Sequence, residues 1–402
     1  MATNENKLIV AILIGAVAGI LCGIIFGTSM ASVAWIGDLF LDALKMMIVP
    51  LIVAAVITGV TSLGDIRKLG KVGGLTLLYY ASTTSIAVFI GLVVVNLVQP
   101  GVGVGEATTA LSSDIAEKAD TGFVDIIRSL ISPNIISAAA NMQLLPLIFF
   151  CLIFAAALTT IGDKNNTIIK FFDGLNEVMM KLVLWVMYFA PIGIFALIAG
   201  KIGTAGGAEA IQQELVAVGS YCFTVILGLS IHFVVLFLIL IFFTKRGRDY
   251  FFSLSKALVT AFGTASSSAT LPLTMKSAAE AGVDKRSVKF VLPIGATVNM
   301  DGTALYESVA VMFIAQAYGI SMGIGEQTII FITATLAAIG AAGIPQAGLV
   351  TMLIVLEAVN LPAEGIGLIL AVDWFLDRFR TTVNVWGDSV GAAVIEPHLP
   401  KQ

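Results

Sequence analysis

The residues of this chain whose types and spacing could do chemistry are concentrated in residues 373–388, DWFLDRFRTTVNVWGD. At the 100° per residue of an α-helix, the polar side chains of this stretch fall within an arc of about 100°. The flanking residues, 365–372 and 389–396, are mostly apolar, so the pattern predicts a membrane helix with charge on one face. Charge at membrane depth costs about 3 kcal/mol per group and persists where it faces protein, an ion or a substrate. The polar positions are Asp373, Asp377, Arg380, Thr381, Asn384 and Asp388.

A second polar group interrupts the apolar stretch of residues 292–316. Asn299, Asp301 and Thr303 alternate there through Gly302, a pattern that predicts an unwound turn within a helix. Unwound turns expose carbonyl oxygens, and a hard monovalent cation needs several oxygen ligands from backbone, amide and carboxylate groups. Asp301 and Asp388 would each supply one negative charge for such a cation. The alternative is structural, with Asp301 paired to Arg380 or Arg378.

Two interrupted segments must position these groups. Residues 255–275 contain GTASSSATLP and residues 333–355 contain IGAAGIPQAG, each broken near its middle by Gly, Pro or Ser. Non-helical backbone at membrane depth is tolerated only where it is buried in protein or lines a cavity. Each segment therefore predicts a re-entrant hairpin, and such a pair indicates an inverted repeat with its substrate site at the midplane. Basic residues on both flanks of the first hairpin predict that it opens from the cytoplasm, and the second then opens from outside.

The composition is that of a polytopic membrane protein. Of 402 residues, 58% are hydrophobic and 12% are charged, against about 45–50% and about 25% in soluble domains. The net charge of -4 is small and scattered, which argues against nucleic acid as a partner. The three cysteines lie in apolar runs, which argues against a disulfide framework or a zinc site.

Hydropathy also predicts the membrane topology. Lys and Arg gather in alternate loops, near residues 65 and 163 and after residue 243. The positive-inside rule then places both termini in the cytoplasm of a multi-pass protein of the cell (inner) membrane. The expected spans outside the hairpins and the segments described above are 8–27, 39–60, 73–98, 144–161, 168–200 and 216–243.

Four segments, NMDGTALYE, SSSATLP, GAAGIPQAG and DRFRTTVNVWGDSVGA, resemble the signatures of the sodium:dicarboxylate symporter family, and specifically its glutamate and aspartate transporters. The likeness covers most of the chain, is strongest over residues 261–396, and is closest to the excitatory amino-acid transporters, with short loops that predict a prokaryotic member. It implies an all-α membrane protein of eight transmembrane helices and two re-entrant helical hairpins, with inverted repeats. It further implies a homotrimer in membrane lipid that works by an elevator mechanism.

The resemblance also implies how the chain is divided. A scaffold would come mainly from residues 8–62 and 122–200. A transport domain would come mainly from residues 72–98 and 216–396, with hairpin 1 at about 252–280 and hairpin 2 at about 328–358. The implied function is secondary active symport of L-glutamate or L-aspartate into the cell with sodium ions, and no organic cofactor is expected.

Substrate roles follow from the resemblance, position by position. Arg380 would form a bidentate fork on the side-chain carboxylate of the substrate, because a planar guanidinium matches carboxylate geometry and stays charged. Asp377 would hold the α-ammonium group and Asn384 the α-carboxylate. The remaining hydrogen bonds and the closure over the ligand would come from Ser266, Ser267, Met300, Thr303, Ile344, Gly348 and Thr381.

The resemblance implies three sodium sites. The first would use Gly295, Asn299, Asn384 and Asp388. The second would use backbone oxygens near Thr297, Met300, Ala338, Ile339 and Ala341. The third would use Tyr80, Thr83, Thr84, Asn299 and Asp301.

Two further residues set the chain apart from archaeal relatives. Those relatives carry an arginine where Ala265 stands, whereas here the second arginine is Arg378, as in the animal transporters, and it would preserve a gating charge near the site. Glu307 stands where sodium-driven archaeal relatives place glutamine. A carboxyl group in an apolar environment favours its protonated form, so Glu307 could couple transport to a proton and to potassium countertransport. The alternative is a glutamate neutralised permanently by a neighbour such as Arg378 or by hydrogen bonds, contributing only to structure.

Other functions were weighed against acidic amino-acid transport. A neutral amino acid would leave Arg380 unpaired and a C4-dicarboxylate would leave Asp377 unpaired, each a costly buried charge. A substrate-gated anion channel would be distinguished by the absence of concentrative uptake. An intramembrane hydrolase built on residues 266–268 would need a positioned base, and the chain holds only His232 and His398.

Overall fold

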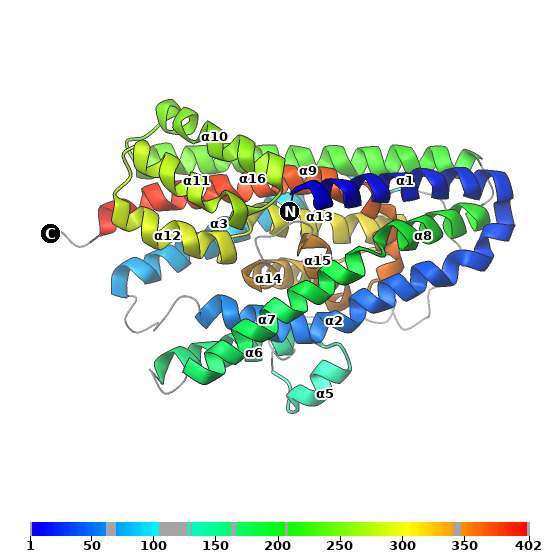
Figure 1. The fold of residues 1–402 in the computed structure, drawn as a ribbon, viewed down its shortest axis with the longest axis horizontal. Helices are drawn as coiled ribbons and strands as arrows, with labels where there is room; N and C mark the ends of the chain where they lie inside the picture. The colour runs from blue at the N-terminus through cyan, green and yellow to red at the C-terminus, as the bar shows by residue number, and fades with distance from the viewer. Residues whose placement is uncertain are drawn as a thin grey trace.

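The computed structural model describes residues 2–61, 70–103, 128, 131–161, 166–205, 208–340 and 347–399. Throughout these residues the regular structure is α-helical with short 3-10 helices, and they contain no strand. The predicted all-α class is therefore confirmed. The longest axis of the molecule follows helices such as α1 (Ala2–Phe26), α9 (Ala208–Phe243) and α16 (Leu370–Ile395) (Figure 1).

Helices from the first half of the chain form one packed group around α2 (Ala34–Thr61), which we call the first helix group. Helix α2 contacts four of its members, one of which, α8 (Ala190–Ala205), also has α1 lying along it (Figure 1). The other members are α1, η1 (Gly27–Val33), α5 (Ile135–Ala140), α6 (Leu144–Thr160), α7 (Asn166–Met187) and α8 (Ala190–Ala205).

The stretch expected as one span over residues 168–200 is broken into two helices, α7 and α8, which are bent by 52° at a short break. That the pair makes one span stays a prediction. Pro191 lies in the first turn of α8. A proline lacks the N–H that would bond back to the preceding turn, so it is accepted at a helix start and interrupts a helix interior. One continuous apolar stretch therefore folds as two helices.

Helix α3 (Gly70–Val98) joins helices from the second half of the chain in a second helix group. Its centre is α13 (Asp301–Ala317), which is buried along almost its whole length and contacts α3, α9, α14, α15 and α16. The two groups meet mainly where α2 contacts α14 and α15. The other members are α9, α10 (Arg248–Thr264), α11 (Ser267–Glu280), α12 (Lys285–Val298), α14 (Ile324–Gly340), α15 (Ala347–Ala358), η4 (Ala363–Leu368), α16 and η5 (Glu396–His398).

The two segments predicted as hairpins are helix pairs, α10 with α11 and α14 with α15. In the first pair, Ala265 takes a left-handed conformation (φ 48°), and the Ser266 hydroxyl accepts a hydrogen bond from the Ala269 N–H at 3.2 Å. This contact is a helix N-cap, which accounts for the start of α11. The turn of the second pair lies outside the described residues. That both pairs are re-entrant stays a prediction.

Helix α16 begins later than expected. The apolar residues before Leu370 form η4 instead of continuing the helix. The charged stretch of the sequence therefore starts in the first turn of α16, at Asp373.

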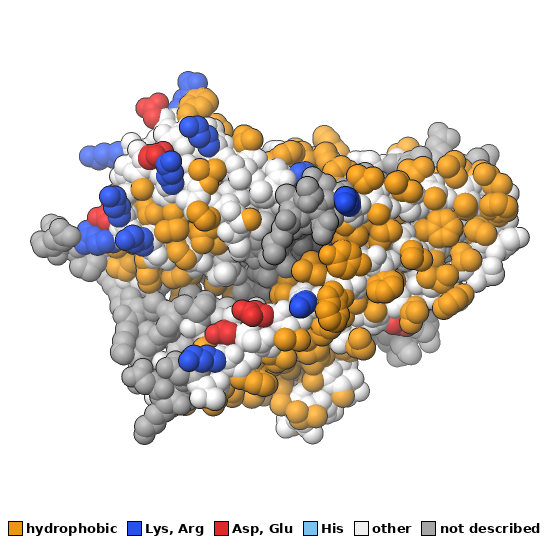
Figure 2. Space-filling view, in the orientation of Figure 1, with side chains coloured by type: hydrophobic (Ala, Val, Ile, Leu, Met, Phe, Trp, Pro, Cys, Tyr) orange, Lys and Arg blue, Asp and Glu red, His pale blue; other side chains and the backbone are white. Residues whose placement is uncertain are grey.

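Several helices have the length and composition of membrane spans. Among the described residues, three helical stretches qualify, Val10–Thr61, Val72–Val98 and Val216–Phe243, and the bent pair α7–α8 would be a fourth. Hydrophobic side chains cover the face over α1, α2 and α8, whereas charged side chains gather at the opposite end, around α10, α11 and α12 (Figure 2). This surface fits a protein embedded in lipid, and the count of eight spans stays a prediction.

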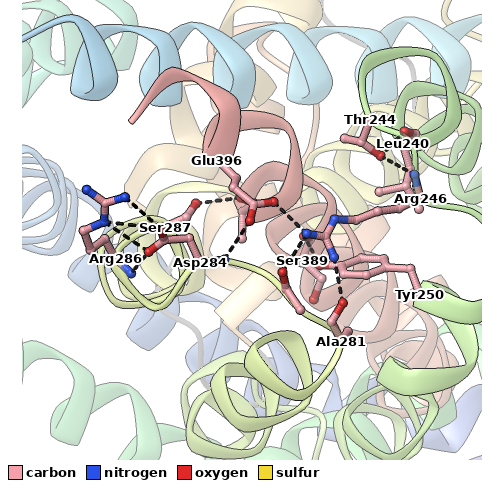
Figure 3. A network of polar contacts seen from close by, with 12 residues as sticks. Leu240, Thr244, Arg246, Tyr250, Ala281, Asp284, Arg286, Ser287, Ser389 and Glu396 are labelled. Atoms are coloured by element: carbon pink, nitrogen blue, oxygen red, sulfur yellow. Dashed lines mark hydrogen bonds and ion pairs between the residues drawn. The ribbon is translucent and has the colours of Figure 1, made fainter. Parts of the chain in front are cut away.

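A polar network ties the C-terminal end of α16 to the first helix pair (Figure 3). Arg246 donates to the carbonyls of Ala281 at 2.7 Å and Gly282 at 2.8 Å, and its Nη2 also lies 2.7 Å from Glu396. The other carboxylate oxygen of Glu396 accepts from the Asp284 N–H at 2.9 Å. One arginine and one glutamate therefore join the end of α9, the α11–α12 connection and the end of α16.

The same network is reinforced by hydroxyl groups (Figure 3). Tyr250 donates to the Ser389 carbonyl at 2.6 Å, and Ser287 donates to the Ala392 carbonyl at 2.6 Å. At its exposed edge, the hydrogen bonds from Arg286 hold the pKa of Asp284 below its usual value, so this carboxylate stays ionised. Helices α10 and α12 are thus fixed to the last turns of α16.

An aromatic cluster joins α9 to α16. The Trp386 ring is fully buried and stacks on Phe233 with a centroid distance of 5.2 Å and an interplanar angle of 18°. Phe251 meets it edge-on at 5.7 Å. The Trp386 indole N–H also donates to the Phe233 carbonyl at 3.3 Å. Aromatic pairs of this kind add about 0.5–1.5 kcal/mol each beyond the area they bury.

Candidate functional site

The polar face of α16 is buried within the second helix group. Arg380 is fully buried, with Nη1 2.9 Å from Asp373 and Nη2 2.9 Å from Asp377. The guanidinium carbon lies 3.9 Å from the centre of the Tyr306 ring, a cation–π contact. One positive charge therefore sits among two carboxylates and an aromatic face. The predicted arc is confirmed, since all six of its polar residues are buried.

The start of α15 closes over this arginine. A Cβ atom added to Gly348 would lie 2.8 Å from Arg380 Nη1 and 3.4 Å from Thr303 Cγ2, so the backbone here has no room for a side chain. Gly348 was predicted to close over the ligand, and the structure places it against the guanidinium. Ile344 lies outside the described residues.

The first helix pair also packs against α16. Helices α10 and α11 both contact α16, and Ser266 and Ser267 are buried at the start of α11. Arg378 Nη1 donates to the carbonyls of Phe262 at 3.1 Å and Gly263 at 3.0 Å. A cation at the C-terminal end of a helix complements the helix dipole. Arg378 thus caps α10 at the tip of this pair, beside the position of Ala265.

Neutral hydrogen-bonding groups lie between the arginine and the helix break. The Asn384 amide oxygen accepts from the Gly302 N–H at 2.7 Å. Its Nδ2 lies 3.3 Å from Met300 Sδ and 3.3 Å from Thr303 Oγ1. The structure therefore brings Asn384, Met300 and Thr303 together as predicted, with Thr381 buried on the same face of α16.

The predicted unwound turn is confirmed between α12 and α13. Asn299 (φ -104°, ψ 90°) and Met300 (φ -114°, ψ 56°) leave the helical conformation, and α13 restarts at Asp301. Thr84 donates to Asp301 Oδ1 at 2.7 Å, and Thr83 Oγ1 lies 3.3 Å from the same oxygen. Both threonines also approach Asn299 Oδ1, at 3.5 Å and 3.4 Å.

This set of buried oxygens matches the predicted third sodium site. The Tyr80 carbonyl lies beside it, accepting from Thr83 at 3.2 Å, while the Tyr80 hydroxyl turns away to the Val291 carbonyl at 2.8 Å. Any contribution of Tyr80 to a cation at Asp301 would therefore come from its carbonyl oxygen. The hypothesis that Asp301 pairs with Arg380 or Arg378 is wrong, because its partners are the two threonines and His232 at 3.1 Å.

The second buried carboxylate near this turn is that of Asp388 on α16. Asn299 Nδ2 donates to Asp388 Oδ1 at 3.0 Å. The Gly295 backbone is close enough that a Cβ there would collide with this carboxylate and with the Tyr80 hydroxyl. The structure thus brings together Gly295, Asn299 and Asp388 of the predicted first sodium site, and Asn384 lies one turn before Asp388 on α16.

The predicted second sodium site lies at the boundary between the two helix groups. Helix α12, with Thr297, contacts α14, with Ala338 and Ile339. The Thr297 hydroxyl donates to the Ile294 carbonyl of its own helix at 3.0 Å. A cavity of about 280 Å³ opens beside them, lined by Thr84, Val298 and Ile339 and by Val60 and Leu152 of the first helix group. Ala341 lies outside the described residues.

Glu307 is fully buried on α13, two turns beyond Asp301. Its side chain faces Thr351 of α15, and Arg380 is a charged group near enough to act on it. Arg378, the neighbour considered from the sequence, instead reaches the tip of the first helix pair.

Three contacts at the candidate site were not predicted from the sequence. Asp373 was placed on the polar face but given no partner, although it faces Arg380 two turns along α16. Tyr306 was read only as part of a motif, and His232 was considered only as a possible base of the hydrolase alternative. An ionisable side chain inside a span is a signal of function in itself, and it applied to His232.

Comparison with known proteins identifies a family and several similar transporters. Residues 8–397 match the model of the sodium:dicarboxylate symporter family. The chain is 41% identical to excitatory amino acid transporter 1 of Ambystoma tigrinum over 421 residues, which cover 91% of this chain and 77% of that protein. It is 38% identical to excitatory amino acid transporter 2 of Homo sapiens over 469 residues (99% and 80%). It is also 38% identical to an excitatory amino acid transporter of Caenorhabditis elegans over 445 residues (98% and 88%).

Proposed function

The chain belongs to the sodium:dicarboxylate symporter family, and from that premise we propose that it carries L-glutamate or L-aspartate into the cell together with sodium ions. Membership of a symporter family makes it an integral membrane transporter and not a hydrolase. Of the serines that raised the hydrolase alternative, Ser266 caps α11.

The observation that carries the choice of substrate is the pairing of Arg380 with Asp373 and Asp377. An acidic amino acid brings two carboxylates and one ammonium group, and the site offers a guanidinium beside carboxylates at 2.9 Å. The substrate side-chain carboxylate would take the guanidinium fork, while the α-ammonium would take Asp377. A substrate with both charges would replace both partners of the Arg380–Asp377 pair, whereas one without the ammonium group would leave Asp377 as a buried unpaired ion.

The α-carboxylate of the substrate would meet neutral donors. The Asn384 oxygen accepts from the Gly302 N–H. Its Nδ2, which contacts Thr303 Oγ1 in this structure, is therefore the group that would donate to the substrate carboxylate. Thr303 and Thr381 add hydroxyl groups, and the start of α15 at Gly348 would cover the bound molecule. Ser266, Ser267 and Met300 complete the proposed pocket.

Sodium ions would bind at the two buried carboxylates. Asp301 with Thr83, Thr84 and Asn299 supplies carboxylate, hydroxyl and amide oxygens within hydrogen-bond distance of one another. Asp388 with Asn299 and Gly295 supplies the other charged site. Two ions at these carboxylates would balance charges that are otherwise costly inside a membrane. The third ion would use backbone oxygens of α12 and α14 at the boundary between the helix groups.

The movement that we propose is that of an elevator, in which the second helix group crosses the membrane against the first. Support comes from the packing, because each group is continuous within itself and the two meet mainly through α2, α14 and α15. The first helix group would be the scaffold of a homotrimer, and the charged end around α10, α11 and α12 would face the cytoplasm (Figure 2). Eight spans and two re-entrant hairpins complete this proposal.

Proton cotransport and potassium countertransport would depend on Glu307. Its full burial beside Thr351 and Arg380 supports a carboxyl group that binds a proton when the substrate site is filled. When the proton leaves, the carboxylate would face the Arg380 charge.

Uptake into proteoliposomes tests the proposed function. With an inward sodium gradient, radiolabelled aspartate or glutamate should accumulate above the external concentration. Unlabelled aspartate and glutamate should compete, whereas succinate and serine should not. Accumulation that needs no sodium, flux that only equilibrates, or competition led by succinate or serine would each reject it.

A further inference from the structure

A histidine reaches the proposed sodium site from a third helix. His232 lies on α9, is fully buried, and places Nε2 3.1 Å from Asp301 Oδ2. Helix α9 contacts both α13 and α16, so the ring enters between the helix that carries Asp301 and the helix that carries Asp388. The two residues are 69 positions apart in the chain, and the contact is made by tertiary packing.

The two oxygens of Asp301 have different surroundings. Oδ1 faces the hydroxyls of Thr84 at 2.7 Å and Thr83 at 3.3 Å. Oδ2 faces His232, and on another side it meets the α16 backbone, where a Cβ added to Gly387 would lie 3.0 Å away. Only Oδ1 therefore lies on the side where threonine and Asn299 oxygens converge.

We propose that His232 is a positioning residue for the sodium site, which donates from Nε2 to Asp301 Oδ2 and holds the carboxylate with Oδ1 toward the ion. This inference rests on the proposed binding of sodium at Asp301. It assigns a role in ion binding to a residue of α9 that does not itself coordinate the ion.

The contacts of the ring fix its tautomer. Nδ1 is buried and has no hydrogen-bond partner among the described residues. A proton on Nδ1 would be a buried donor without an acceptor, which is costly, whereas a proton on Nε2 meets a carboxylate oxygen. The neutral ring with its proton on Nε2 is thus the form that satisfies the contact.

A carboxylate held in the binding orientation binds an ion more tightly than a mobile one. Groups that hydrogen-bond to a metal ligand orient it, and losing such a group commonly weakens metal binding about 10- to 100-fold. Without His232, the buried Oδ2 loses its partner, and the carboxylate can turn that oxygen toward Thr83 and Thr84. The ion would then have to reorder the site as it binds.

The test compares side chains at position 232 that place a hydrogen-bond donor at different points. Glutamine sets its amide nitrogen where histidine has Nε2, and asparagine sets it where histidine has Nδ1. We would measure equilibrium binding of radiolabelled aspartate to purified full-length protein over a range of sodium concentrations. The variants are His232→Gln, His232→Asn and His232→Leu. The control is Thr224→Val, which removes a fully buried hydroxyl of α9 that donates only within its own helix, to Ser220 at 2.7 Å.

We expect His232→Leu and His232→Asn to need on the order of tenfold more sodium for half-maximal binding. His232→Gln should stay within about threefold of the native protein, and Thr224→Val should match it. If the leucine variant does not fold, the sodium requirement of the asparagine variant is compared with that of the glutamine variant instead. An unchanged sodium requirement in the leucine and asparagine variants overturns the proposal, as does a glutamine variant no better than these.

A double variant separates this inference from the proposed site itself. Asp301→Asn should raise the sodium requirement, and His232→Leu added to it should raise it no further, because the contact is already lost. If Asp301→Asn alone has no effect, the sodium site at Asp301 is wrong. If Asp301→Asn has its effect and His232→Leu still adds its full factor, the site stands and the positioning role of His232 is wrong.

Discussion

Replacing Arg380 with threonine removes a buried guanidinium that two carboxylates face, Asp373 and Asp377, each at 2.9 Å. Removing one partner of a buried ion pair costs about 3–5 kcal/mol, because the remaining charge is left uncompensated. We expect the free energy of unfolding of R380T to fall by about this amount. Adding Asp373→Asn should recover part of the loss, because an amide needs no opposite charge in a buried place.

The substrate should respond in a way that stability alone would not produce. A hydrogen bond to a charged group contributes about 1.5–3 kcal/mol, and the proposed fork makes two of them. Losing about 3–6 kcal/mol lowers affinity by about 10² to 10⁴. Aspartate binding to R380T should weaken by such a factor, whereas serine, which has no side-chain carboxylate, should bind at least as well as it does to the native protein.

Two measurements on purified protein in detergent decide the matter, thermal unfolding and equilibrium binding of radiolabelled aspartate and serine at saturating sodium. Arg246→Gln is the control, because it removes a guanidinium that pairs with Glu396 at the end of α16, away from the site. It should lower stability without changing aspartate affinity. Native aspartate affinity in R380T would refute the assignment of the substrate carboxylate to Arg380, and no recovery with Asp373→Asn would refute the electrostatic reasoning.

Three further changes test the ion sites. Asp388→Asn should raise the sodium concentration for half-maximal uptake at least tenfold, since about 1.4 kcal/mol is tenfold and a buried cation site loses a full charge; an unchanged sodium curve would contradict the first site. Gly387→Ala would place a Cβ 3.0 Å from Asp301 Oδ2 and should also raise the sodium requirement, whereas Gly74→Ala, with nothing within 4 Å, should not; equal curves for both would show that the carboxylate tolerates the displacement. Glu307→Gln should abolish sodium- and aspartate-driven acidification reported by a pH-sensitive dye trapped in proteoliposomes, while exchange of external for internal aspartate continues; native protein that produces no acidification would leave Glu307 a structural residue.

Local patterns were enough to predict the main site-bearing elements. The buried face of α16 follows from the spacing of Asp373, Arg380, Asn384 and Asp388, because helical periodicity is a property of neighbouring residues. The break before α13 was predicted for the same reason, since a glycine among alternating polar residues is also local. Both features could be recognised without knowing which helices pack together.

Contacts between distant segments were not accessible in this way. Local pattern offered an arginine as the alternative partner of Asp301, whereas the structure places His232 beside it. The two threonines of α3 that also contact it were expected only from the family resemblance. A periodic pattern says which face of a helix is polar and leaves open which helix covers that face. The bend between α7 and α8 was missed for a different reason, because hydropathy averages over Pro191 and does not register its absent N–H.

The buried aromatic cluster at the α9–α16 contact also makes the protein its own optical probe. Trp35 and Trp185 are 62% and 54% exposed on α2 and α7, where a brominated lipid can quench them, whereas Trp386 is shielded by Phe233 and Phe251. Phe233 follows His232 directly in α9. The fourth tryptophan, Trp374, is partly buried near the start of α16, so Trp374→Phe would leave Trp386 as the main source of the emission that survives lipid quenching. Sodium could then be titrated by the change in this signal from the contact beside Asp301.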